Sequence, residues 1–242
     1  MGIIKSILKG YILQIATIEK KTRLSESAYH IRIKSESIKD IDFIPGYFLR
    51  LAIGINEEKL SLKDKVRSYS IWNIDKNTGC IDLAIATHST GIGAEWAKHC
   101  KEGELVYFKW KKGKFLIDDT ADSYLMIGDL SALSHLYVLH RHLPKNKETT
   151  SILYSQNKRE LFPDINGTIP FDFYEMPQNP HEEIINKVRQ IVPKMTGSKM
   201  VYIGGDSRIC VALNQYFRKE LNWVTKHVKT KPFWNPDKKG LE

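Results

Sequence analysis

The sequence predicts a two-domain protein: an antiparallel β-barrel over residues 1–118, followed by a small α/β domain with a parallel sheet over residues 119–242. Three observations predict this fold class. The chain has 242 residues, which is enough for two modest domains that each bury a core. Its first half consists of short β-rich runs separated by turns, whereas after Asp118-Asp119 strands alternate with helices. We therefore expect two different architectures along one chain.

In the first half, the best strand candidates are 30–34, 47–53 and 80–86. The second and third alternate between apolar and polar residues or run apolar, as strands of a sheet do. The turn-forming residues at 75–79 separate neighbouring runs. This spacing predicts antiparallel strands.

In the second half, strands are predicted at 123–128, 151–155 and 199–205. Helices are predicted near 131–142 and 181–191, and a third begins after 205 and ends near Leu221. Strands that alternate with helices of about 10–15 residues indicate parallel strands joined by crossover helices.

The amino-acid composition favours a soluble globular protein over a disordered or membrane-spanning one. Apolar residues make up 42% and charged residues 27%, which is typical of a globular chain. No run of about 18 apolar residues could span a membrane, and Lys9 and Gly10 interrupt the apolar N-terminal run, so we expect a soluble, cytoplasmic protein. Three widely spaced cysteines, Cys80, Cys100 and Cys210, indicate reduced core thiols.

The net charge of +9 favours an acidic partner: nucleic acid, a membrane surface, an anionic small molecule or an acidic electron-transfer protein. Lysines gather at 226–231, at 238–239 and at 109–114. His135, His140 and His142 lack the clustered carboxylates or cysteines of a metal site, so we predict no protein-bound metal.

A first candidate site is Arg67-Ser68-Tyr69-Ser70, at the start of a predicted strand. In a strand, Arg67 and Tyr69 share one face, while the two serines share the other. A guanidinium can pair with pyrophosphate oxygens and a tyrosine ring can stack on an isoalloxazine ring, so the pattern suits a flavin nucleotide. An exposed arginine beside a packed tyrosine in an ordinary strand is the alternative interpretation.

A second candidate site runs from Thr87 to Trp96, where a glycine-bearing turn lies between a predicted strand and a helix-like segment. Backbone N–H groups in such a turn, next to a helix N-terminus, can bind a diphosphate. An ordinary strand–helix connection without a ligand is the alternative interpretation of this segment.

The order and spacing of these two sites resemble the ferredoxin–NADP reductase superfamily, and specifically its siderophore-interacting branch. His88, Gly91 and Trp96 match the His…Gly…Trp pattern of that branch. Gly128-Asp129 with Ala132-Leu133 resembles its Gly-Asp-x-Thr-Ala-Leu segment, and Phe233-Trp234-Asn235 resembles its terminal Tyr-Trp-Arg. The resemblance implies a Greek-key FAD-binding barrel and a Rossmann-like NAD(P)-binding domain. Ala94 stands where a serine commonly helps to hold phosphate, so backbone contacts would do more here.

The resemblance also implies functional residues, none of them catalytic beyond the flavin. Those expected to bind FAD are Arg67, Ser68, Tyr69, Ser70, Thr87, His88, Thr90, Gly91, Ile92, Gly93, Ala94, Trp96 and Trp234. Those expected to bind NAD(P)H are Gly128, Asp129, Ser155, Lys158, Arg159, Gly205 and Asp206. By charge alone, Lys109, Lys238 and Lys239 are expected to contact a siderophore.

We therefore expect an FAD-dependent reductase that transfers electrons from NADPH, NADH or ferredoxin to ferric siderophores and so releases iron(II). Its partners would be a ferric siderophore and, as one alternative donor, ferredoxin; no nucleic acid or membrane partner is expected, and the protein would be a monomer. Two other functions stay open: a general ferredoxin or flavin–NAD(P) reductase, and a basic binding module without redox chemistry.

Overall fold

The structure, a computed structural model, describes residues 13–53 and 65–237. The chain divides into two compact units, the first ending at Lys114 and the second beginning at Phe115. This division lies close to the boundary expected after residue 118.

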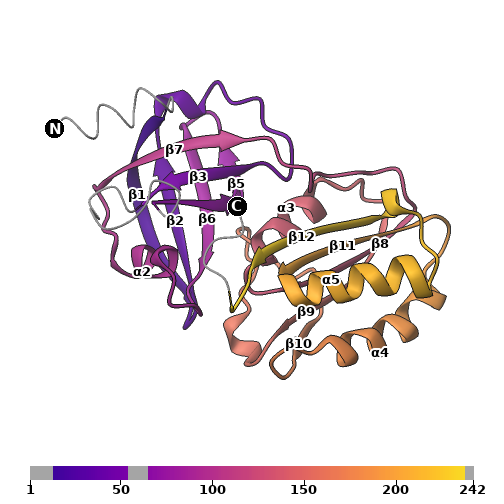
Figure 1. The fold of residues 1–242 in the computed structure, drawn as a ribbon. Coiled ribbons are helices and arrows are strands. Elements are labelled where there is room, and N and C mark those ends of the chain that lie inside the picture. The colour runs from indigo at the N-terminus through magenta and orange to yellow at the C-terminus, as the bar shows by residue number, and fades with distance from the viewer. Residues whose placement is uncertain (1–12, 54–64, 238–242) are drawn as a thin grey trace. The chain divides into compact units, whose positions relative to one another are not determined.

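The described residues of the first unit form an antiparallel sheet with the strand order β4-β3-β7-β1-β2-β6-β5 (Figure 1). Its strands are β1 (Gln14–Ser25), β2 (Ala28–Lys34), β3 (Phe48–Ala52), β4 (Val66–Ser70), β5 (Asn73–Asp75), β6 (Cys80–Ala86) and β7 (Leu105–Lys111). The order places β7 between β1 and β3, so segments far apart in sequence are neighbours. The predicted strands at 30–34, 47–53 and 80–86 correspond to β2, β3 and β6.

Alternation along these strands buries one face of the sheet. Fully buried side chains from four strands form this core, and Ile18 of β1, 1% exposed, joins them: Ile31, Ile33, Leu49, Leu51, Ile81, Leu83 and Phe108. The 3₁₀ turn η1 (Glu36–Ile38) follows β2, and helix α2 (Ile92–His99) follows β6. Helix α2 buries the small residues Gly93, Ala94 and Ala97.

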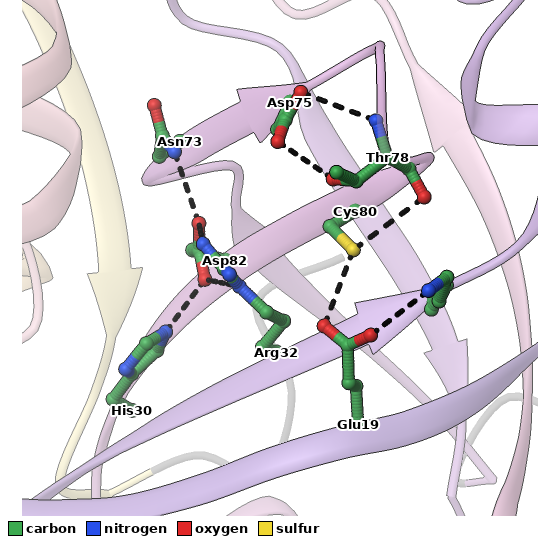
Figure 2. Close-up of polar contacts among 9 residues, drawn as sticks. Glu19, His30, Arg32, Asn73, Asp75, Thr78, Cys80 and Asp82 are labelled. Carbon is green, nitrogen blue, oxygen red and sulfur yellow. Dashed lines mark hydrogen bonds and ion pairs between the residues drawn. The ribbon is translucent and has the colours of Figure 1, made fainter.

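A polar cluster also lies on this sheet, centred on the fully buried carboxylate of Asp82 in β6 (Figure 2). Arg32 of β2 donates to both carboxylate oxygens, at 2.7 and 3.0 Å. His30 lies 2.7 Å from Oδ1, and Asn73 of β5 donates to Oδ2 at 3.0 Å. These contacts hold the pKa of Asp82 well below its usual range despite burial, which by itself raises it.

The described residues of the second unit form a parallel sheet with the order β10-β9-β8-β11-β12. Its strands are β8 (Ser123–Asp129), β9 (Glu148–Ser155), β10 (Phe173–Glu175), β11 (Lys199–Asp206) and β12 (Val228–Trp234). Its helices are α3 (Leu133–His142), α4 (His181–Ile191) and α5 (Ser207–Gln215). Shorter helical turns are η2 (Lys158–Glu160), η3 (Val192–Lys194), the π-helical turn η4 (Tyr216–Glu220) and η5 (Thr225–His227).

Helices cover both faces of this sheet, which explains why every residue of β8 is buried. Leu125 and Ile127 join the core that α4 and α5 complete. Gly128 faces the other way, where a Cβ would lie 2.8 Å from Leu136 of α3. Figure 1 shows α4 and α5 on one face and α3 on the other. The predicted antiparallel β-domain and parallel α/β domain are thus confirmed.

Two of the three predicted helices have boundaries that differ from the predictions. Helix α3 begins at Leu133 rather than near Ser131, because residues 129–131 form the turn that precedes it. Helix α5 ends at Gln215, and the chain continues as η4 toward the predicted end at Leu221. None of the described helices is long and apolar enough to cross a membrane.

The three cysteines have free thiols and are buried, as predicted. Burial raises the pKa of the Cys100 thiol to about 11. At neutral pH this thiol is therefore protonated and unreactive.

Candidate functional site

The first two predicted motifs, far apart in sequence, are in contact in the first unit. A Cβ built on Gly93, in the first turn of α2, would collide with the Tyr69 hydroxyl and lie 3.5 Å from Cγ of Arg67. The glycine-bearing turn therefore packs directly on β4, and no larger residue fits at position 93 without movement.

Strand register explains which side chains of β4 face this turn. Tyr69 pairs with Leu49 and Arg67 pairs with Leu51 of β3, so these two β4 side chains lie on one face. The ring centroids of Tyr69 and Trp96 of α2 are 6.4 Å apart with an interplanar angle of 29°. An arginine, a tyrosine and the start of a helix thus converge at one place.

The N-terminus of α2 offers donors for an anion. Its N-cap is Gly91, which has no side chain to cap the helix, and the first backbone bond runs from Glu95 N to Gly91 O. The N–H groups of Ile92, Gly93 and Ala94 precede that bond, as at any helix start. Together with the helix dipole and the nearby Arg67, they form a site suited to phosphate.

Two of the residues expected to bind FAD carry buried hydroxyl groups. Within the part of the chain that the structure describes, Ser68 Oγ and Thr87 Oγ1 are buried and make no hydrogen bond. A buried hydroxyl without a partner costs about 1–3 kcal/mol, which a polar ligand would recover. Ser68 lies on the face of β4 opposite Arg67 and Tyr69, so of the two hydroxyls it is Thr87 Oγ1 that, with the glycine at position 93, fits a bound dinucleotide such as FAD. Of the remaining predicted residues in the turn, His88, Thr90 and Gly91 are exposed and Ala94 is buried.

In the second unit, the predicted nucleotide residues follow the carboxyl ends of neighbouring parallel strands. Gly128 and Asp129 end β8, Ser155 ends β9, and Gly205 and Asp206 end β11. In parallel sheets these ends share one edge, where open α/β folds bind their ligands at the change in strand order. Strand β8 is that point, because β9 and β11 flank it on opposite sides.

Several of these side chains are engaged within the protein itself. Asp129 accepts hydrogen bonds from Ser131, from the Asp206 backbone and from the indole N–H of Trp234. Asp206 caps α5 by accepting from Arg208 N at 2.9 Å and pairs with the Arg208 guanidinium at 2.6 Å. Trp234, predicted to contact FAD, lies at the end of β12 in this second unit.

The basic pair Lys158 and Arg159 lies on η2, immediately after β9, and both side chains are exposed. Two carboxylates that were not predicted from the sequence, those of Glu160 and Glu175, lie close to this pair. Ser155 Oγ donates to Glu160 at 2.5 Å, and the Lys158 backbone N–H donates to Glu175 at 3.3 Å. Glu160 could have been found from the sequence, because it directly follows Lys158 and Arg159. Glu175 could not, because it comes close to Lys158 only through the pairing of β9 with β10.

Of the three lysines predicted for a siderophore, Lys238 and Lys239 lie outside the described residues. Lys109, on β7, is directly opposite Arg50 of β3, and Arg50 in turn is opposite Ser68 of β4. Sequence reasoning missed Arg50, because only the strand register shows that it neighbours Lys109. Two neighbouring cations on one face of a sheet attract an anion.

The α3 histidines make contacts within the protein. His135 is 1% exposed and its Nε2 lies 2.8 Å from the Phe115 carbonyl oxygen. Burial lowers the pKa of His135 to about 3, so its ring is neutral at neutral pH. His142 Nδ1 lies 2.8 Å from the Val138 carbonyl oxygen.

Sequence profiles of two families match the chain, one for each unit. The profile of the oxidoreductase FAD-binding domain matches residues 15–117. The profile of the siderophore-interacting protein family matches residues 121–237. No curated protein sequence matches the chain significantly.

Solved structures share the two-domain fold at low sequence identity. The siderophore-interacting protein SipS from Aeromonas hydrophila has a TM-score of 0.75 and 17% identity, covering 93% of this chain and 92% of its own. The siderophore-interacting protein from Acinetobacter baumannii has a TM-score of 0.77 and 15% identity, covering 92% and 90%. Ferredoxin–NADP⁺ reductase from Plasmodium falciparum has a TM-score of 0.70 and 15% identity, covering 91% and 96%. The chain therefore combines a first unit that matches the oxidoreductase FAD-binding domain with a second unit that matches the siderophore-interacting protein family.

Proposed function

We propose that this protein is an FAD-dependent ferric-siderophore reductase that takes electrons from NADPH, NADH or ferredoxin and releases iron(II). The observation that carries this proposal is the packing of the Gly93 turn on Arg67 and Tyr69, in a chain whose two units match these two profiles. The carboxyl edge of the parallel sheet, where Asp129 ends β8, is weaker support for a nucleotide as the electron donor.

The residues that would hold FAD have distinct tasks. The Arg67 guanidinium and the N–H groups at the start of α2 would neutralise the pyrophosphate. Tyr69, positioned by Trp96, would offer an aromatic surface to the isoalloxazine ring. When bound, FAD supplies the exchange between two-electron donors and one-electron acceptors.

The electron balance sets the stoichiometry. Oxidation of one NADPH or NADH releases two electrons and one proton, enough to reduce two ferric siderophores, whereas a ferredoxin that gives one electron reduces one. Hard oxygen donors hold iron(III) far better than the softer iron(II), so reduction itself loosens the metal. The protein then needs only to bind the chelate, and it has no need to ligate the iron.

For that binding, the chain would use cations. Lys109 beside Arg50 is the described candidate, and Lys238 and Lys239 are further ones. An anionic ferric siderophore would be attracted to these two neighbouring cations of β3 and β7. Exposed charges of this kind act over about 8 Å at physiological ionic strength, so the contribution should weaken with salt.

The function is tested by anaerobic turnover of the FAD-loaded protein with ferric siderophores. We expect iron(II), trapped by a ferrous chelator, to form faster than the artificial acceptor ferricyanide is reduced. Faster reduction of ferricyanide would instead indicate a general flavin reductase. If the purified protein binds no flavin, the remaining candidate function is a basic binding module without redox chemistry.

The donor gives a second prediction, based on the exposed Lys158 and Arg159. If NADPH is a donor, changing both residues to alanine should raise its KM about tenfold and leave the KM for NADH nearly unchanged, because only NADPH carries a 2′-phosphate. Steady-state kinetics with both nucleotides measures this difference.

A matched control uses the adjacent, exposed pair Arg218 and Lys219 on η4. Changing these two residues to alanine removes the same charge and should alter neither KM. Equal losses for NADPH and NADH in the Lys158/Arg159 variant would remove that pair from phosphate recognition. If neither nucleotide reduces the flavin, reduced ferredoxin becomes the donor to test.

A further inference from the structure

The carboxylate of Asp129 joins segments that are far apart in sequence. Its Oδ1 accepts from the Ser131 backbone at 2.9 Å and from the Ser131 hydroxyl at 2.5 Å. Its Oδ2 accepts from Asp206 N and from Trp234 Nε1, both at 2.8 Å. We call Asp129, Ser131, Asp206 and Trp234 the Asp129 cluster. One carboxylate thus connects the ends of β8, β11 and β12.

The backbone around the cluster is shaped to permit these contacts. Gly205 has φ +120°, and a Cβ there would collide with the Asp129 carboxylate. The register between β11 and β12 shifts at this point: Gly205 pairs with Pro232, but Asp206 pairs with Trp234. A β-bulge of this kind redirects a side chain, and here the indole N–H reaches Asp129.

The chain beyond Trp234 is held near the same edge. Asn235 Nδ2 donates to Ser207 Oγ at 2.5 Å, at the start of α5, and Asp237 N donates to Asn235 at 2.7 Å. The indole bond to Asp129 is therefore the first in a series of contacts that fix where the chain leaves β12.

We infer that Asp129 is a positioning residue, which fixes Trp234 and the segment that follows it at the carboxyl edge of the α/β sheet. Asp129 is 8% exposed and its carboxylate already accepts from four donors, so it has little capacity left for a direct bond to a nucleotide. Asp129 would act on the reaction through Trp234, and the two residues would form one functional unit.

Asp129→Asn tests this inference with little change in shape. An amide has one acceptor oxygen, and its NH₂ group cannot accept. If the oxygen stays with Ser131, which is near in sequence, the NH₂ group faces the Asp206 and Trp234 donors. Trp234→Phe removes the indole donor and keeps an aromatic ring. Asp122→Asn is the matched control, because Asp122 also accepts from Ser198 N and Oγ, at 2.8 and 2.7 Å, just before β8 begins.

Hydrogen–deuterium exchange of the whole protein is the primary measurement. We expect Asp129→Asn and Trp234→Phe each to speed exchange about tenfold in peptides covering residues 228–237, through loss of a hydrogen bond to a charged acceptor. The double variant should match the single variants, and Asp122→Asn should leave these peptides unchanged. Unchanged exchange at 228–237 in Asp129→Asn, or equal acceleration throughout the α/β domain, would overturn the inference.

Kinetics provides a second readout, which rests on the proposed function. A positioning role predicts that Asp129→Asn and Trp234→Phe change kcat and the KM for the ferric siderophore alike, with no further change in the double variant. A rise in the nucleotide KM for Asp129→Asn alone would instead identify Asp129 as a nucleotide ligand. If no ferric siderophore is reduced, the proposed function fails, while the exchange measurement still decides the role of Asp129.

Discussion

Arg67→Ala is expected to weaken FAD binding by about 30-fold, or about 2 kcal/mol, because it would remove the charge-assisted contact that we propose between Arg67 and the pyrophosphate. The first turn of α2 already lies against the arginine stem, with Cγ 3.5 Å from the Cβ position of Gly93. Titration of flavin-free protein with FAD, followed by flavin fluorescence, measures the change. Arg67→Lys keeps the charge but loses the planar fork, so an intermediate loss is expected.

The matched control is Arg23→Ala in the same domain. Arg23 is exposed on β1, and its guanidinium donates to the Ser25 and Glu26 carbonyl oxygens. This variant should bind FAD normally. Arg67→Ala protein that purifies with full flavin occupancy and a native circular dichroism spectrum would show that the arginine does not hold the cofactor.

The change of architecture along the chain could be predicted because the two halves carry different periodicities. Short β-rich runs such as 80–86, separated by turns, indicate strands of an antiparallel sheet, and the wholly apolar centre of 123–128, followed by a helical segment, indicates a parallel strand covered on both faces. Strand order could not be predicted in the same way. The placement of β7 between β1 and β3 depends on contacts between distant segments, for which the local pattern has no signal.

The candidate sites divide along similar lines. The arginine–tyrosine strand and the glycine turn could be recognised as separate motifs, but their contact through Gly93 emerges only from the fold. Arg50 was missed because it neighbours Lys109 only in the strand register. Asp129 and Trp234 were assigned to different ligands, because nothing in a sequence shows that residues 105 positions apart share a hydrogen bond.

The Asp82 cluster illustrates a different limit. Asp82 is the one charged residue in an otherwise apolar strand, and the sequence alone does not explain it. Its role in a buried ion pair becomes visible only when β2 and β6 are aligned. Register places Arg32 directly opposite Asp82 and His30 two residues away on the same face. A buried charge of this kind depends on its partners, because removing one leaves the others buried without compensation.

Asp82→Ala is accordingly expected to lower the free energy of unfolding of the first domain by about 3 kcal/mol. The Arg32, His30 and Asn73 donors shown in Figure 2 would lose their shared acceptor. Urea unfolding, with hydrogen exchange of the β2 and β6 amides to assign the domain, measures this loss. Glu36→Ala is the control: it breaks a surface ion pair to Lys39 in the same domain, at 2.8 Å, and should change little.

Asp82→Asn adds a pH test of the same cluster. The folded-state pKa of Asp82 is depressed, so its charge stabilises the protein fully above the unfolded value of about 3.9, and this contribution is lost as the pH falls toward the lower folded value. The stability difference between the wild type and Asp82→Asn should therefore narrow as the pH falls below about pH 4. A difference that does not change with pH would mean that the shape of the side chain, and not its charge, stabilises the cluster.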